Sequence, residues 1–217
     1  MQIAIPLFDR FTALDAVGPY EVLSRVPGAR VDFVAKEPGV YRTDTRMLAI
    51  EVERSFEDAQ QPDVLVFPGG VGTRALTKDE ETLAWVRQVD EHTRFTTSVC
   101  TGALVLAAAG LLDGLDATTH WMARDELERL GACPVPARVV EQGKLITAAG
   151  VSSGIDMALT LVDRLVGPEV AQAIQLGIEY DPQPPFDAGA PEKAPAEIVD
   201  IVRRVEEAEN QAMLDAG

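Results

Sequence analysis

The chain has 217 residues, of which 47% are hydrophobic and 25% charged, as in folded globular proteins and unlike disordered or fibrous ones. Its 19 basic and 35 acidic residues give a formal net charge of −16, and so acidic a surface repels nucleic-acid phosphates and anionic lipids. The longest uncharged apolar run, residues 103–112, is too short to cross a bilayer, and the first ten residues lack the features of a signal peptide. Two cysteines are too few for a disulfide scaffold. We therefore predict a cytoplasmic protein that binds neither nucleic acid nor membrane.

Short apolar or alternating segments, typical of β-strands, recur along the first 150 residues. They are residues 3–8, 29–35, 47–52, 63–67, 94–99 and the hairpin-like pair 138–141 and 144–148. Between them lie segments with apolar residues at helical spacing. These are residues 80–91 after the possible cap Asp79, 101–109 before Gly110, 123–130 before Gly131, and 155–166. Because parallel strands need crossover helices, this order predicts a doubly wound, mostly parallel α/β sheet flanked by helices on both faces.

The composition changes at Tyr180. Five prolines in residues 180–195 exclude a helix or a central strand there, and residues 196–214 then have the pattern of a charged helix. We predict a single domain over residues 1–217, whose proline-rich arm either wraps the domain or reaches a second subunit.

Cys100 is the strongest candidate for chemistry. It lies between a predicted strand and a predicted helix, with Gly102 two positions later, as in the elbows that expose a nucleophile at the top of an α/β sheet. Helix N–H groups near the sulfur would favour the thiolate and lower the pKa of the cysteine. The alternative is a small buried hydrophobic residue. Cys133 lies on a predicted loop without such a context, and we take it as structural.

A nucleophilic cysteine usually needs a partner for proton transfer, most often a histidine. The two histidines give no clear partner: His92 ends a charged helical stretch, and His120 is as consistent with a structural role beside Trp121 as with a functional one. A cysteine–histidine pair is therefore possible but not indicated.

Carboxylates are the other option. Asp15 and Glu21 flank Gly18-Pro19 after the first predicted strand. A partly buried acid has a raised pKa and can donate a hydrogen bond to a thiolate. Helix capping for Asp15 and a solvated first-turn position for Glu21 are the alternatives. Spacing alone does not separate the two acids.

Gly69 and Gly70 follow the strand at residues 63–67, where their N–H groups could face a developing negative charge or merely form a tight turn. The sequence contains no phosphate-binding or dinucleotide-binding glycine motif and no cluster of metal ligands. We expect no cofactor and no metal.

Three segments together resemble the DJ-1/PfpI superfamily, whose fold is like that of class I glutamine amidotransferases: LDAVGPYEVL, VFPGG and SVCTGALVLAAAGLL. The segments ATTHW, AAGVSSGID and IEYDPQPPFDAG resemble its isocyanide hydratase branch. The resemblance runs from end to end of the chain. It implies a cofactor-free homodimer acting on a small electrophile, and hydration of isocyanides to N-substituted formamides through a cysteine thiolate assisted by an aspartic acid.

By the same resemblance, Cys100 is the nucleophile and Asp15 the acid that hydrogen-bonds it and transfers protons. Thr101 lies beside the nucleophile, and the N–H groups of Gly70 and Thr101 bind the anion. The pocket residues are then Gly69, Val151 and His120.

Peptidase-like members of the superfamily have a histidine directly after the cysteine, where this chain has Thr101, which argues against proteolysis. Members that resemble DJ-1 have a glutamate where Asp15 stands, which weakens glyoxalase-type chemistry without excluding it. Transcription regulators share the first motif, but we expect no DNA-binding domain, since the chain ends after one acidic helix. The competing functions are therefore detoxification of other electrophiles and redox sensing by Cys100.

Overall fold

The computed structural model describes the backbone of residues 1–215 and the side chains of residues 1–206 and 208. It divides into two compact units, Met1–Glu179 and Tyr180–Gly217. Over residues 1–215, the helices are all too short or too polar to span a membrane.

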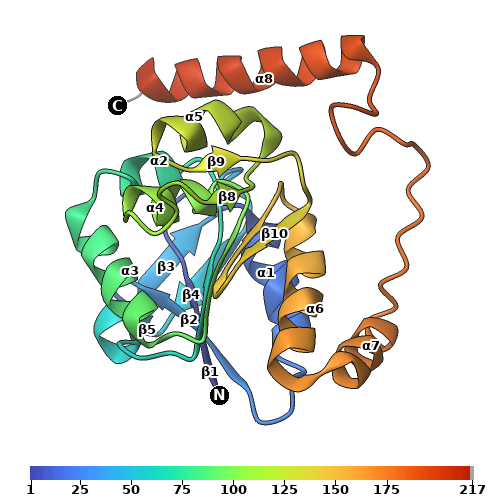
Figure 1. The fold of residues 1–217 in the computed structure, drawn as a ribbon. Coiled ribbons are helices and arrows are strands. Elements are labelled where there is room, and N and C mark those ends of the chain that lie inside the picture. Colours follow the sequence, from blue (N-terminus) through green and yellow to red (C-terminus); the bar gives the residue numbers. More distant parts are fainter. Residues whose placement is uncertain (216–217) are drawn as a thin grey trace. The chain divides into compact units, whose positions relative to one another are not determined.

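The first unit is built on a seven-stranded sheet with the order β10-β11-β7-β6-β1-β2-β5 (Figure 1). Its strands are β1 (Gln2–Pro6), β2 (Arg30–Ala35), β5 (Arg54–Ser55), β6 (Val64–Phe67), β7 (Phe95–Val99), β10 (Val139–Gln142) and β11 (Leu145–Ala148). All neighbouring strands are parallel except the hairpin β10–β11. The predicted fold class is confirmed.

Helices cover both faces of this sheet (Figure 1). One layer contains α1 (Ala13–Leu23), α6 (Ser153–Val166) and α7 (Pro168–Gly177), and the other α2 (Thr73–Leu76), α3 (Glu80–His92), α4 (Gly102–Ala108) and α5 (Arg124–Arg129). Short 3-10 turns occur at η1 (Phe56–Asp58) and η2 (Trp121–Ala123).

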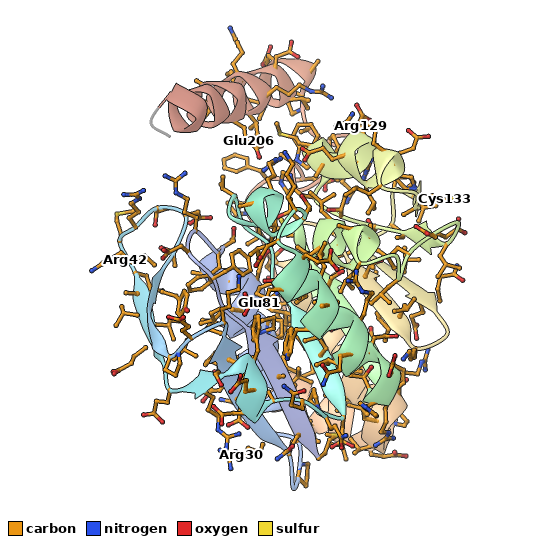
Figure 2. All side chains as sticks on the ribbon, turned by 90° about the vertical axis from the view of Figure 1, so that its left-hand side faces the viewer. Arg30, Arg42, Glu81, Arg129, Cys133 and Glu206 are labelled. Atoms are coloured by element: carbon orange, nitrogen blue, oxygen red, sulfur yellow. The ribbon has the colours of Figure 1, made fainter. Side chains whose placement is uncertain are left out.

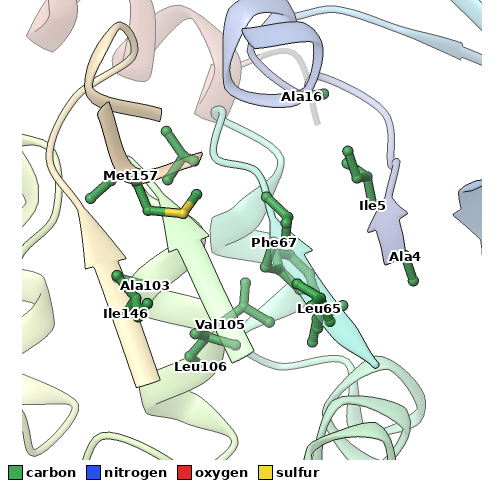
Figure 3. Packing of buried hydrophobic residues seen from close by; sticks show 14 of the residues in the cluster. Ala4, Ile5, Ala16, Leu65, Phe67, Ala103, Val105, Leu106, Ile146 and Met157 are labelled. Carbon is green, nitrogen blue, oxygen red and sulfur yellow. The ribbon is translucent and has the colours of Figure 1, made fainter. Parts of the chain in front are cut away.

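The core fills the space on both sides of the sheet. Figure 3 shows Phe67 and Leu65 of β6 between Ile5 of β1 and side chains of α4, with Met157 of α6 nearby. All four residues of β6 are buried, as are all but the first of β1. Each large apolar side chain buried here stabilises the fold by roughly 1.5–3 kcal/mol. This rigid centre fixes the strand ends that carry the candidate site.

The topology places the carboxyl ends of β1, β6 and β7 together. From β1 the chain winds outward to β2 and β5, then returns to β6 beside β1 and winds the other way to β7 and β11. Adjacent strands that leave in opposite directions form the crevice in which doubly wound proteins bind ligands. Asp15, Gly69 and Cys100 follow these three strands in turn.

Two elements differ from the sequence prediction. The strand expected at residues 47–52 is β4 (Ala49–Val52), which pairs antiparallel with β3 (Gly39–Arg42) in a hairpin outside the main sheet. The first helix begins at Ala13 and contains Pro19 in its interior, so Asp15 lies within its first turn rather than ahead of it. The pairing of β8 (Asp116–Ala117) with β9 (Cys133–Pro134) and the helices α2 and α7 were not predicted.

The second unit begins with residues 180–195, which contain neither helix nor strand, as the prolines predict. It continues as α8 (Ala196–Asp215), whose exposed apolar side chains Ile198, Ile201, Val202 and Val205 recur at helical spacing. It stays a prediction that this segment forms one domain with the first unit. Whether the arm wraps that domain or reaches a second subunit stays open in the same way.

Candidate active site

Cys100 occupies a sharp turn between β7 and α4. Its φ is +55°, a left-handed conformation that non-glycine residues rarely adopt. Its N–H donates to the carbonyl oxygens of Ala148 and Ala149 at 3.1 and 3.0 Å, and its own carbonyl accepts the Thr119 hydroxyl at 2.8 Å. The side chain is buried, with 6% of its surface exposed. These contacts hold the strained elbow in place with its sulfur beside the strand ends.

Asp15 lies in the first turn of α1 and is completely buried. Its Oδ2 accepts a 2.9 Å hydrogen bond from the Gly69 N–H. Its Oδ1 is buried and makes no hydrogen bond of normal geometry with the described residues. One oxygen is thus anchored to the turn after β6, and the other remains for the sulfur or a substrate.

The site brings Asp15 and Cys100 together. A Cβ placed on Gly69 would lie 2.7 Å from Asp15 Oδ2 and 2.8 Å from Cys100 Cβ, so both side chains crowd around one backbone position. Burial raises the pKa of Asp15 to about 7, against opposing hydrogen bonds from Gly69 and Cys100. The carboxyl therefore carries a proton for much of the time near neutral pH and can donate it.

The sulfur does not follow the expectation based on the helix terminus. Burial raises the pKa of Cys100 well above its ordinary value, and a charged Asp15 raises it further. The N–H groups of Val151 and Thr101 lower it, as expected for a helix start, but their effect is smaller than that of burial. A thiolate therefore forms most readily when Asp15 is protonated, because the repulsion is then replaced by a hydrogen-bond donor.

Of the two N–H groups expected to bind an anion, that of Gly70 already has a hydrogen-bond partner. The Gly70 N–H already donates to Thr101 Oγ1 at 2.9 Å, while that hydroxyl donates to the Gly70 carbonyl oxygen at 3.1 Å. Thr101 thus ties its own turn to the turn after β6. Anion binding by Gly70 stays a prediction that requires this hydrogen bond to break. The N–H groups that face the sulfur belong to Thr101 and Val151.

The N–H of Val151 faces the Cys100 sulfur, and the spacing of residues in the sequence did not indicate this contact. It has a φ of +34°, so the turn before α6 is strained, as is the cysteine elbow. His120 packs against the preceding Gly150, where an added Cβ would lie 2.6 Å from the imidazole Cδ2. Burial, together with the charges of Arg74 and Arg124, lowers the pKa of His120 and favours the neutral ring. The imidazole is not among the groups that shift the pKa of Cys100.

The remaining candidates lie away from the pair. Glu21 is exposed, and its carboxylate pairs with Arg25 at 2.5 Å. His92 is exposed at the end of α3. Cys133 is a free, exposed cysteine at the outside of the unit (Figure 2), on the short strand β9 rather than on the expected loop. Of the acids left open by spacing, the structure places Asp15 beside Cys100.

Sequence reasoning missed three residues that support the site. They are Thr12, Asp44 and Thr119, which make hydrogen bonds to loop backbone or to each other around the pair. Thr119 stands in the segment ATTHW, but no local pattern marks its hydroxyl as a partner of the Cys100 carbonyl. Asp44 comes from the β3–β4 loop, far from the other residues in sequence.

A separate cavity of about 240 Å³ lies at the ends of β1, β2 and β6, lined by residues that include Leu7, Phe8, Lys36, Tyr41, Phe56 and Phe67. The predicted pocket residues Gly69, His120 and Val151 do not line it. Among the described residues, no group of three or more His, Cys, Asp or Glu side chains could hold a metal ion.

Comparison with known proteins gives consistent matches. Residues 1–164 match the model of the DJ-1/PfpI family. The chain is 47% identical over 204 residues to the isonitrile hydratase of Pseudomonas putida, covering 94% of this chain and 89% of that one. It is also 30% identical to the transcriptional regulator CdhR of Pseudomonas aeruginosa, covering 78% of this chain but 51% of the regulator.

Solved structures agree on the fold. A ThiJ/PfpI family protein from Pseudomonas syringae superimposes with a TM-score of 0.91 and 40% identity, covering 97% of this chain and 88% of that one. Drosophila melanogaster DJ-1beta superimposes with a TM-score of 0.75 at 22% identity, covering 82% of this chain and 97% of that one, which shows a shared fold alone.

Proposed function

This chain belongs to the DJ-1/PfpI family, and from that premise we propose that it is an isonitrile hydratase, which adds water to isocyanides without a cofactor and releases N-substituted formamides. The observation that carries the proposal is the buried pair of Asp15 and Cys100, with one carboxyl oxygen free of other hydrogen bonds, in a chain 47% identical to an isonitrile hydratase.

In the first step the Cys100 thiolate attacks the terminal carbon of the isocyanide, forming a carbon–sulfur bond. The proton of the Asp15 carboxyl moves to the same carbon, so that R–N≡C becomes the thioimidate R–N=CH–S–Cys and Asp15 becomes a carboxylate. The pKa of about 7 suits this role, since an acid that titrates near the working pH both holds and releases its proton readily.

In the second step water attacks the thioimidate carbon. One proton of the water passes to the nitrogen, and the other returns to the Asp15 carboxylate as the carbonyl forms. The carbon–sulfur bond then breaks, giving R–NH–CHO, the Cys100 thiolate and a protonated Asp15. One carboxyl serves both steps, so no histidine is required.

The test is turnover of a small panel of isocyanides, followed by detection of the formamide. Cys100→Ala should abolish formation of the product, and Asp15→Asn should lower kcat by about 10²-fold or more because the proton donor is lost while the Gly69 hydrogen bond is kept. Mass spectrometry of the wild-type protein with substrate should show an adduct on Cys100.

Matched controls remove the same groups elsewhere. Cys133→Ala and Glu21→Gln change an exposed thiol and an exposed carboxylate and should leave turnover unchanged. Formamide production by Cys100→Ala would overturn the mechanism. Turnover of methylglyoxal without any isocyanide hydration would favour a glyoxalase-type enzyme, and oxidation of Cys100 without turnover of either would favour a sensor.

The cytoplasmic location and the homodimer are likewise proposals. Light scattering on the purified protein at low micromolar concentration tests the homodimer, and the mass of a single chain would contradict it.

A further inference from the structure

Asp44, in the loop between β3 and β4, is hydrogen-bonded to the loop that follows β1. Its Oδ2 accepts the Thr12 hydroxyl at 2.8 Å, and its N–H donates to the Phe11 carbonyl oxygen at 2.9 Å. The neighbouring Thr43 forms an isolated parallel bridge with Phe11. The hairpin outside the main sheet is therefore joined to the chain segment that leads into α1.

Thr12 connects Asp44 to the catalytic carboxyl. The Thr12 N–H donates to the Gly69 carbonyl oxygen at 2.8 Å, and the Thr12 carbonyl oxygen accepts the Asp15 N–H at 3.1 Å. The Gly69 N–H completes the ring by donating to Asp15 Oδ2 at 2.9 Å. Holding the Thr12 hydroxyl thus fixes the residue that binds both Gly69 and Asp15.

The charge of Asp44 also acts on Asp15. Burial is the largest cause of the raised pKa of Asp15, and the negative charge of Asp44, the smallest of the four causes, raises it further. Asp44 is not among the groups that shift Cys100. Asp44 is half-buried, and its carboxylate accepts hydrogen bonds from the Thr12 hydroxyl and the Thr45 N–H. Asp44 therefore acts on the pKa of the carboxyl and not on that of the sulfur.

From this chain of contacts we propose that Asp44 is a positioning residue, which favours the proton on Asp15 over Cys100 and so increases the fraction of the sulfur that is present as the thiolate. The use of that thiolate rests on the proposed function. The distribution of the proton does not, because it can be measured without any isocyanide.

The experiment follows alkylation of Cys100 by iodoacetamide, a neutral reagent that reacts with the thiolate, across pH 5 to 10. It uses a Cys133→Ser background, since the exposed thiol would otherwise react as well. Asp44→Asn keeps an oxygen to accept the Thr12 hydroxyl but removes the charge. We expect alkylation near neutral pH to slow by about two- to fivefold.

Two variants separate charge from geometry. Asp9→Asn removes an exposed carboxylate in the same region. Asp9 is not among the groups that shift the pKa of Asp15, so this variant should leave the rate of alkylation unchanged. Thr12→Val removes the hydroxyl and keeps the Asp44 charge, and should slow alkylation because the carboxyl is held less firmly. At about 1 M salt the effect of Asp44→Asn should shrink, whereas that of Thr12→Val should persist.

Equal rates for wild type and Asp44→Asn would overturn the inference, as would an equal slowing by Asp9→Asn. Equal rates for Thr12→Val would overturn the part assigned to the hydroxyl. If Asp44→Asn slows alkylation in a protein that hydrates no isocyanide, the inference stands and the proposed function fails. If the protein hydrates isocyanides and alkylation is insensitive to Asp44→Asn, the proposed function stands and the inference fails.

Discussion

The hydrogen bond between Gly69 and Asp15 leaves no room for a side chain on residue 69. The Gly69 N–H donates to Asp15 Oδ2 at 2.9 Å, and a Cβ on Gly69 would stand 2.7 Å from that same oxygen and 2.6 Å from the Thr101 nitrogen. The glycine is required here by close approach, since its φ is not in the left-handed region.

Gly69→Ala should therefore displace the carboxyl from the sulfur. We expect hydration to fall by about 10²-fold, since a displacement of about 1 Å can cost that much, and stability to fall by about 1–3 kcal/mol. Gly177→Ala, where a Cβ would meet nothing within 4 Å, is the control and should leave turnover unchanged. Formamide production and urea denaturation measure the two effects. Wild-type turnover in Gly69→Ala would contradict the assigned geometry.

Thr119→Val should weaken the cysteine elbow. The variant removes the hydroxyl that donates to the Cys100 carbonyl oxygen, at a cost of about 1–2 kcal/mol for the lost hydrogen bond. Thr118→Val is a matched control, because its hydroxyl donates to the Ala137 carbonyl oxygen at 2.7 Å, away from the elbow. Both variants should lose similar stability, but only Thr119→Val should slow alkylation of Cys100. An equal slowing by the two would show that the effect is general.

The raised pKa of Asp15 predicts a dependence of stability on pH. Its folded-state pKa of about 7 lies above the ordinary value of 3.8, so the native state binds more protons than the unfolded chain between these values. The stability due to this group is fully present below pH 3.8 and is lost as pH rises through about 7.

Asp15→Asn should remove the loss of stability that the wild type shows as the pH rises. We expect the variant to match the wild type near pH 4 and to be more stable at pH 8 by about 2–4 kcal/mol, as a shift of this size implies. Glu21→Gln, at an exposed position, should show no such crossover. Urea titrations at the two pH values provide the measurement. A variant less stable than the wild type at pH 8 would show that the carboxylate is stabilised by groups other than those described.

The parts of the fold that follow from periodicity were predictable. The apolar run of β6 and the helical spacing of α3 define their elements locally, and alternation of such segments favours a parallel sheet. The β3–β4 hairpin was not predictable as a separate unit, because the pattern at residues 47–52 is that of any half-buried strand. Its partner is chosen by tertiary contacts.

The site was predictable only in part. The position of Cys100 follows from a strand meeting a helix. Spacing alone left Asp15 and Glu21 as equal candidates, the resemblance favoured Asp15, and the fold buries Asp15 and exposes Glu21. The pKa of the sulfur could not be inferred from the helix terminus, because burial outweighs the N–H groups of Thr101 and Val151. Hydrogen bonds from Thr12 and Thr119 join residues too distant in sequence to leave a local pattern.

The backbone conformation of Cys100 has an evolutionary consequence. At a φ of +55° an L side chain costs about 1–2 kcal/mol that a glycine would not. Cys100→Gly would therefore relieve this backbone strain while it removed the sulfur that we propose as the nucleophile. Selection for thermal endurance alone gains nothing from the strained backbone of this cysteine, whereas selection for the proposed chemistry of the sulfur would keep the residue in place.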